Sequence, residues 1–482
     1  MNQDLTQTLA ARVAAAQAEG RPLRIQGGGT KTWLGRAVDG EPLVVAGHRG
    51  ILSYEPTELV ITARAGTPLA EIQAALAERG QWLAFEPPHF SPATGLADDP
   101  LYPGAGAGAR GKADGGAEAG AGDKADGGLD VGAGGQADGG ADAGRHPNAH
   151  AGSLPGKATL GGTIACGLSG PARPYTGAAR DFVLGVRIIN GKGEVLRFGG
   201  EVMKNVAGYD LSRLMAGAQG TLGVLLDVSL KVLPRPAVEL TLVFDLSPAE
   251  AIRRFNQWAG QPLPLSAACH DGERAHVRLA GNEAAVRAAQ ARLGGEVLAG
   301  EAESFWRAVR ELRHPFFRQG SAYLPGTDYQ QAMAYQKGTA SQTGAAPLWR
   351  LSLPPTAPHD PALGPQFIDW GGALRWVHSE DPLWPVAQAA GGHASRYALA
   401  FTRQDTVAAE EVDADAAGAA DVSGTQELGA GPDRTKERET VEMTGGAVLQ
   451  PLPPALLALH RRLKAAIDPR GILNPGRIYP EL

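Results

Sequence analysis

The sequence predicts an α+β fold, built from short strands and helices that follow one another in no regular alternation. Short runs of apolar and β-branched residues, each bounded by turn residues, indicate the strands. Apolar residues that recur every three or four positions indicate the helices. Because the expected strands are short and irregularly linked, the pattern disfavours a doubly wound parallel sheet. The length of 482 residues suits two or three domains of ordinary size.

The first half of the chain contains two helix signals. Apolar residues on one face predict a helix over 4–19, which Gly20 ends. Thr67 as N-cap and Pro68 at the first helical position predict a second helix, which ends at Gly80. Strands are expected in this half at 23–26, 43–46, 59–63, 82–85, 182–190, 194–198 and 224–233.

The pattern changes after residue 236. A strand is expected over 238–244, and a capping box formed by Ser247 and Glu250 opens a helix that runs to about residue 259. Further strands and helices follow to about residue 402, and a last helix is expected over 454–467. This second group of elements predicts a separate α+β unit between the first half and the tail.

The composition excludes several classes of protein. Two cysteines are too few for a disulfide framework, a cysteine-ligated iron–sulfur cluster or a zinc ribbon, since the two metal sites need about four thiolates. No run of about 18 apolar residues is present, so no integral membrane segment is expected. The first twenty residues lack the apolar core of a signal peptide. We therefore expect a cytoplasmic protein.

The net charge of −6 is unevenly distributed along the chain. Residues 97–150 carry nine acids and four bases, and residues 406–442 carry ten acids and three bases. The rest of the chain therefore has a net charge of +6, which suits an anionic cofactor or substrate. This charge is too small to indicate nucleic-acid binding.

Residues 104–144 consist largely of glycine, alanine and aspartate, with an Ala-Asp-Gly-Gly unit that recurs every twelve residues. We interpret this stretch as a disordered repeat expansion, because it has too few apolar residues to form a core. The alternative, a calcium-binding β-helix, needs an apolar residue in each unit. Residues 106–111 match G-x-G-x-x-G, but no strand or helix signal flanks them, so we reject a nucleotide site there. Residues 406–442 are interpreted as a solvated acidic loop.

Two glycine-rich segments indicate a site for an anion. Residues 26–31 (Gln-Gly-Gly-Gly-Thr-Lys) follow a strand, and consecutive glycines let backbone N–H groups approach an anion closely. A flexible turn is the alternative interpretation. Residues 158–170 place small residues in a helical pattern, which suits a helix beginning against a bulky ligand. Close packing of the helix on a sheet is the alternative there.

Several segments, taken in order, resemble the FAD-binding fold of the vanillyl-alcohol oxidase and p-cresol methylhydroxylase superfamily. Within it they are similar to the FAD-binding E subunits of bacterial glycolate oxidases. The resemblance covers about residues 21–479 apart from the two insertions. The matching segments are FEPPH at 85–89, ATLGG at 158–162, KNVAGYDL at 204–211, GTLG at 220–223, GGH at 391–393 and LNPGR at 473–477.

The resemblance implies a division of the chain into four parts. Residues 1–236 would form a FAD-binding domain that contains a disordered insertion at 97–156. An α+β cap domain would follow at 237–405, and an acidic disordered loop at 406–448. Residues 449–482, a helix and a tail, would complete the FAD-binding domain.

The resemblance also implies the cofactor and its binding residues. FAD would be held non-covalently, because Thr30 stands where covalent members of the superfamily have a histidine. No metal site is expected. The residues expected to bind FAD are Gln26, Gly27, Gly28, Gly29, Thr30, Lys31, Thr159, Gly161, Gly162, Thr163, Gly167, Gly170, Gly220, Thr221, Gly223, Val224, Asn474 and Arg477.

Two functions follow from the resemblance. In the favoured one, the chain is the FAD-binding subunit of a complex that oxidises the 2-hydroxy acid glycolate to glyoxylate. Its partners would be a homologous flavoprotein catalytic subunit and an iron–sulfur subunit, and any contact with the inner membrane would be made through them. In the alternative, the chain is a stand-alone FAD-dependent 2-hydroxy-acid dehydrogenase.

The histidines bear on this choice. The sequence lacks the H-x-G-D-G-N-x-H motif of catalytic family members, which favours the subunit role. His270 and His393 are the candidates for catalytic residues, and a structural role on a strand is the competing interpretation of each.

Overall fold

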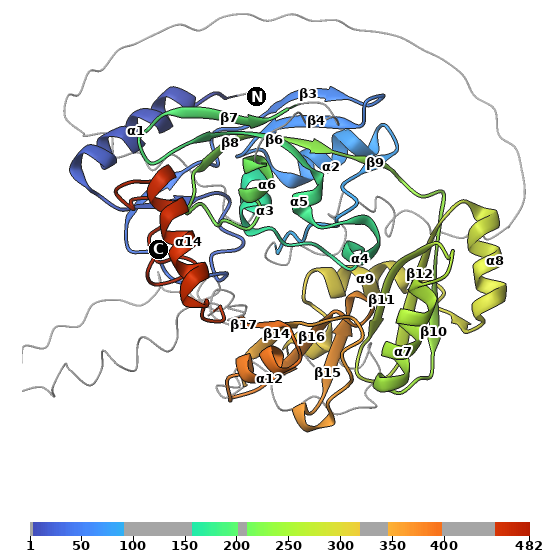
Figure 1. Ribbon diagram of the computed structural model, residues 1–482. Coiled ribbons are helices and arrows are strands. Elements are labelled where there is room, and N and C mark those ends of the chain that lie inside the picture. The colour runs from blue at the N-terminus through green and yellow to red at the C-terminus, as the bar shows by residue number, and fades with distance from the viewer. Residues whose placement is uncertain (1–2, 91–156, 201–209, 319–345, 398–448) are drawn as a thin grey trace, which may run out of the picture.

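The computed structural model describes residues 3–90, 157–200, 210–318, 346–397 and 449–482. These residues form two main sheets, shown one above the other in Figure 1, with the first half of the chain around the upper sheet. The C-terminal helix, drawn in red, lies next to the elements of the first half of the chain. In the sequence, the whole of the second unit stands between them. Mixed helices and strands of this kind confirm the α+β class.

The upper sheet has five antiparallel strands in the order β3-β4-β8-β6-β7. Its central strand, β8, is buried along all but its last residue, because α3 and the neighbouring strands cover it. The strands are β3 (Ile51–Glu55), β4 (Val60–Arg64), β6 (Val183–Ile189), β7 (Val195–Gly199) and β8 (Val224–Lys231). The helices of this half are α1 (Thr6–Glu19), α2 (Leu69–Ala77), α3 (Leu160–Cys166), α4 (Arg173–Thr176), α5 (Ala179–Phe182) and α6 (Leu211–Leu214).

The lower sheet has eight strands in the order β13-β10-β12-β11-β15-β16-β14-β17. Its strands are β10 (Val238–Phe244), β11 (Leu265–His270), β12 (Ala275–Gly281), β13 (Glu296–Val297), β14 (Leu348–Ser352), β15 (Gln366–Asp369), β16 (Leu374–His378) and β17 (His393–Tyr397). The helices beside it are α7 (Pro248–Ala259), α8 (Glu283–Leu293), α9 (Ala302–Arg310), α10 (Pro315–Arg318), η2 (Pro361–Leu363), η3 (Trp370–Gly372) and α12 (Trp384–Ala389).

Two short strand pairs complete the described fold. The strands β1 (Leu23–Gln26) and β2 (Glu41–Val44) run parallel, and β5 (Gln81–Trp82) pairs with β9 (Leu233–Pro234). The residues after α14 (Pro454–Ile467) return to the free edge of β1, where the Leu23 N–H donates to the Ile472 carbonyl over 2.7 Å. The tail therefore joins the first half of the chain.

Several predicted elements are confirmed with the same bounds. These are the strands at 23–26 and 238–244 and the helices at 248–259 and 454–467. The N-cap half of the capping box is confirmed, because the Ser247 hydroxyl accepts from the Glu250 N–H. The Glu250 carboxylate accepts from Arg253 instead of completing the box. The hairpin strands 182–190 and 194–198 pair as β6 and β7, each within one residue of the expected bounds.

Two predictions about elements were wrong, and one strand was missed. Thr67 does not cap α2, since its buried hydroxyl bonds to the Gly50 N–H and carbonyl instead, and Pro68 takes the N-cap position. The strand expected at 82–85 overlaps the observed strand β5 only at Trp82, and strand β3 was not predicted.

The insertions at 97–156 and 406–448 and most of segment 204–211 lie outside the described residues. The proposed domain boundaries stay a prediction.

Lys464 anchors the tail in the core. Its ammonium, 7% exposed in the side chain, donates to the Thr221 carbonyl, the Leu473 carbonyl and the Asp468 carboxylate at 2.8, 2.6 and 2.8 Å. Burial lowers the pKa of Lys464, and the Asp468 carboxylate opposes that shift. Asp468 also accepts from the N–H groups of Ile472 and Leu473. The two side chains therefore connect α14, the tail and the loop before β8.

We expect Lys464→Met to destabilise the fold by about 3–5 kcal/mol, because it leaves the Asp468 carboxylate buried without its cation. Urea unfolding of the full chain measures the change in the free energy of unfolding. Arg462→Met, at an exposed position of the same helix, is the matched control and should change it by no more than about 0.5 kcal/mol. Equal stability of the two variants would contradict the anchoring role of Lys464.

Candidate cofactor site

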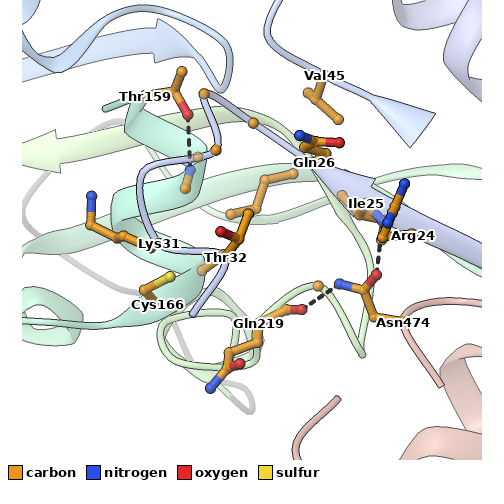
Figure 2. A pocket seen from close by; sticks show the side chains of 18 of the residues that line it. Arg24, Ile25, Gln26, Lys31, Thr32, Val45, Thr159, Cys166, Gln219 and Asn474 are labelled. Atoms are coloured by element: carbon orange, nitrogen blue, oxygen red, sulfur yellow. Dashed lines mark hydrogen bonds between the residues drawn. The ribbon is translucent and has the colours of Figure 1, made fainter. Parts of the chain in front are cut away.

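A cavity of about 400 Å³ opens between β1, α3, the loop before β8 and the C-terminal tail. Its volume falls within the range typical of cofactor and substrate pockets. Figure 2 shows that the side chains at its wall come from segments far apart in the sequence, with Lys31, Thr159, Gln219 and Asn474 on different sides. The glycine-rich segments thus meet at one place.

The loop after β1 offers a run of free backbone donors to this cavity. The N–H groups from Gly27 to Lys31 have no hydrogen-bond partner in the part of the chain that the structure describes. Buried or half-buried N–H groups normally have a partner, so these donors are available to an anion. A loop with such a run of unpartnered donors beside a cavity is suited to act as an anion nest.

Two glycines of this loop are also required by close packing. A Cβ atom on Gly28 would lie 1.7 Å from the Lys157 carbonyl oxygen, and one on Gly27 would lie 2.7 Å from the Thr159 hydroxyl. These distances are too short for any side chain. The loop is therefore pressed against the segment that leads into α3, and Gly28 is needed for that contact whether or not a ligand is present.

The first turn of α3 has little capacity for an anion. The N–H groups of Leu160 and Gly161 donate to the carbonyls of Thr67 and Ala65, and that of Gly162 donates to the Thr159 hydroxyl. A Cβ on Gly161 would lie 2.6 Å from Ala65, whereas one on Gly162 would meet only the Thr159 hydroxyl, at 3.1 Å. Gly161 thus serves the close packing of α3, and Gly162 leaves room in the cavity wall.

Lys31 places a cation in the wall of the cavity. Its residue is 7% exposed, and its ammonium lies 3.2 Å from the Thr30 hydroxyl and 3.4 Å from the His89 carbonyl. Burial lowers the pKa of Lys31, and the nearby Cys166 and Glu311 oppose that shift. Burial disfavours the charged form of Cys166 as well, so it raises the pKa of the thiol and keeps the thiol neutral.

Asn474 and Gln219 form the side of the cavity opposite Lys31. The Asn474 amide donates to the Gln219 carbonyl over 2.6 Å and accepts from the Ile25 N–H over 2.8 Å, as Figure 2 shows. The Oε1 atom of Gln219 is buried without a hydrogen-bond partner among the described residues. An unpaired buried amide oxygen indicates a missing donor, which a bound ligand can provide.

Most of the predicted cofactor residues lie around this one cavity. Those that line it are Gln26, Gly27, Gly28, Gly29, Thr30, Lys31, Thr159, Gly161, Gly162, Gly220, Gly223, Asn474 and Arg477. Those that do not line it are Thr163, Gly167, Gly170, Thr221 and Val224. Thr221, for example, is buried and donates its hydroxyl to the Ala218 carbonyl.

Arg477 lines the cavity but is engaged by the chain itself. Its guanidinium donates to the carbonyls of Arg36 and Thr32, so it holds the loop after Lys31 in place. The cavity residues that the sequence did not single out include Gln219 and Cys166, which stand inside glycine-rich segments, and Ala37, Val38 and Val45, which stand in no motif.

The two candidate catalytic histidines lie elsewhere. His270 is buried on β11, where its ring nitrogens contact the Leu246 carbonyl at 2.9 Å and the Gly272 N–H at 3.1 Å. His393 is exposed at the start of β17, and neither histidine lines the cavity. These contacts favour a structural role for His270. Within the described ranges, no group of three or more His, Cys, Asp and Glu side chains could hold a metal ion.

Comparisons with known proteins agree with this geometry. A family model of the FAD binding domain matches residues 4–95, and one of the C-terminal domain of FAD linked oxidases matches residues 448–478. The two matches contain the first glycine loop and the tail with Asn474 and Arg477, which meet at the cavity. In the part of the chain that the structure covers, no helix is long and apolar enough to cross a membrane.

Relatives of the whole chain are also found. Glycolate oxidase subunit GlcE of Escherichia coli is 38% identical over 482 residues, which cover 99% of each chain. Glycolate oxidase subunit GlcD of Bacillus subtilis is 25% identical over 336 residues, 67% of this chain and 68% of that protein. A solved structure of alkyldihydroxyacetonephosphate synthase aligns with 97% of this chain and 74% of its own, at 12% identity and a TM-score of 0.46. The chain belongs to the family of FAD-linked glycolate oxidase subunits that includes GlcE of Escherichia coli.

Proposed function

We propose that this chain is the FAD-binding subunit of a multi-subunit complex that oxidises glycolate to glyoxylate. The observation that carries the proposal is the run of unpaired N–H groups from Gly27 to Lys31 at the wall of the large cavity. FAD contains a diphosphate, and a nest of backbone donors beside a lysine ammonium is suited to bind one. Bound FAD would supply the hydride acceptor that oxidation of a hydroxy acid requires.

The remaining cavity residues fit the rest of the cofactor. The unpaired Gln219 amide oxygen can accept a hydrogen bond from a ring or ribose donor. Val38, Val45 and Leu225 supply apolar wall, and Gly162 leaves space beside α3. The site thus combines anion donors, an apolar wall and a polar end, as a nucleotide-like ligand requires.

We propose that the FAD is bound without a covalent link. Among the described residues that line the cavity there is no histidine or tyrosine, and Cys166 is the one cysteine. Burial raises the pKa of the Cys166 thiol, and a neutral thiol is a poor nucleophile. Thr30 occupies the position beside the glycine loop from which covalent members attach the cofactor.

We propose that the electrons leave through other subunits. The whole chain contains two cysteines, Cys166 and Cys269, whereas a cysteine-ligated iron–sulfur cluster needs four thiolates. We therefore propose an iron–sulfur partner and a homologous flavoprotein catalytic partner. The 25% identity to a GlcD subunit supports a common origin of two such flavoproteins. We place the complex in the cytoplasm, with any contact to the inner membrane made by the partners.

A stand-alone 2-hydroxy-acid dehydrogenase is the second candidate. It is favoured by the 36% identity to a D-lactate dehydrogenase of Anaerostipes hadrus, which extends over 86 residues, or 18% of this chain. So short a match leaves most of the chain unaccounted for. We keep the subunit role as the main proposal, because the sequence lacks the histidine-rich motif.

Gly162→Asp should lower the FAD content of the folded chain, because it places a carboxylate at the cavity wall, near the donors for the diphosphate. An acidic residue in the first turn suits the helix dipole of α3, so the fold should persist. Gly162→Asn, which has the same size without the charge, is the matched control. Flavin absorbance per folded chain is the measurement, and equal flavin content in both variants would contradict the site.

The purified full chain should carry flavin that acid precipitation releases into the supernatant, and anaerobic glycolate should leave this flavin oxidised. The first result follows from non-covalent binding, and the second from the proposed need for a catalytic partner. Flavin that remains in the precipitate would contradict the first. Bleaching of the flavin absorbance by glycolate in the isolated chain would show that the stand-alone function is correct.

A further inference from the structure

Glu311, the residue after α9, places a buried carboxylate of the second unit against the first half of the chain. It is 4% exposed, and its carboxylate accepts from the His89 N–H over 3.0 Å and from the Phe90 N–H over 2.7 Å. The Arg310 guanidinium donates to the same carboxylate over 2.8 Å. His89 and Phe90 end the segment FEPPHF at 85–90, so Glu311 fixes the backbone at the end of that segment.

The backbone that Glu311 holds is in an unfavourable conformation. Phe90 has a φ of +49°, in the left-handed region that a bulky side chain rarely adopts. A residue keeps such a conformation only where its surroundings impose it. Two N–H groups bonded to one carboxylate impose it here, and the Phe90 ring packs edge-on against Trp33, with 5.2 Å between the ring centres. The orientation of the His89 carbonyl and of the Phe90 ring therefore depends on Glu311.

Both of these groups contact the ammonium of Lys31. The ammonium lies 3.4 Å from the His89 carbonyl oxygen and 5.6 Å from the centre of the Phe90 ring. A carbonyl oxygen and the face of an aromatic ring each attract a cation. The Thr30 hydroxyl, at 3.2 Å, adds a contact from the glycine loop itself. Glu311 thus acts on a lysine of the large cavity without lining that cavity.

The charges around Lys31 act in the same direction. In the described part of the chain, Cys166 on α3 and Glu311 are the titratable groups that act on its ammonium. Burial opposes the ionisation of Glu311, but the charges of Arg310 and His89 and two backbone N–H groups lower its pKa overall, so it is ionised at neutral pH. Burial lowers the pKa of Lys31. Because the Cys166 thiol is neutral, the Glu311 carboxylate is the negative charge that offsets this effect.

We propose that Glu311 is a positioning residue for the cofactor: through the backbone of residues 89–90 it holds the Lys31 ammonium at the cavity wall, ready to pair with the diphosphate of FAD. The inference rests on the proposed FAD site and extends it to a residue outside the cavity. FAD binding should weaken as the pH rises and Lys31 loses its proton. The Glu311 charge should move that loss to higher pH, because it favours the ammonium.

Titration of the flavin-free full chain with FAD across neutral and alkaline pH, followed by flavin fluorescence, tests the proposal. Glu311→Gln removes the charge at nearly constant size, and we expect it to raise Kd about tenfold at neutral pH. The alkaline midpoint, the pH at which half of the FAD affinity is lost, should also fall. Glu311→Asp keeps the charge on a shorter side chain, so it should keep the alkaline midpoint and raise Kd less than Glu311→Gln does.

Lys31→Met shows whether the effect passes through the ammonium. It should weaken FAD binding and abolish the alkaline loss. Adding Glu311→Gln to Lys31→Met should change Kd no further, because both residues act through one ammonium. A merely structural role of Glu311 would lower the FAD affinity equally with and without Lys31. Glu303→Gln, at a more exposed position of α9, is the matched control and should leave Kd and the alkaline midpoint unchanged.

The proposal is overturned if Glu311→Gln binds FAD with the Kd and the alkaline midpoint of the unchanged chain, or if it weakens binding equally in the Lys31→Met variant. In either case the proposed function stands, since FAD is still bound. If Glu311→Gln does not fold, Glu311→Asp decides: an unchanged Kd overturns the proposal, and a raised Kd that Lys31→Met makes disappear supports it. A chain that binds no FAD at all contradicts the proposed function as well.

Discussion

The large cavity depends on one side chain, Asn474, which ties the end of the chain to two segments near its beginning and middle. Its N–H donates to the Leu23 carbonyl, and its amide bonds to the Ile25 N–H and the Gln219 carbonyl. A Cβ on Gly220 would lie 2.7 Å from the Asn474 amide nitrogen, so a glycine is required there. Without the hydrogen bonds of Asn474, β1 and the loop before β8 would not be held together at the wall of the cavity. The tail is therefore part of the site, although it follows the whole second unit.

The sequence predicted which segments form the cavity better than it predicted what each residue does. Glycine runs, caps and the tail motif are local signals, so β1, α7, α14 and the first glycine loop could be placed. The contact of Gly28 with Lys157 joins residues on either side of a long insertion, and no local pattern reveals it. A second, smaller cavity of about 60 Å³ lies where the two halves of the described chain meet. Arg173, Arg350 and Trp370 in its wall come from three elements, none with a motif, so this cavity could not be predicted either.

The two cavities differ in how their charges are arranged. The large one presents backbone N–H groups and Lys31 to a ligand, while its arginine, Arg477, is engaged by backbone carbonyls. The small one presents two stacked side-chain cations and the Asp369 carboxyl group, whose pKa is raised by burial. Backbone donors suit a diphosphate approached closely.

Amide hydrogen exchange, compared between the flavin-loaded and the flavin-free full chain, tests the central claim most directly. The N–H groups of residues 27–31 have no partner within the described chain, so they should exchange slowly only when FAD is bound. The amides of residues 160–163 already have partners and should change less. Exchange at residues 27–31 that stays equally fast in the loaded chain would contradict the claim that this loop holds the cofactor.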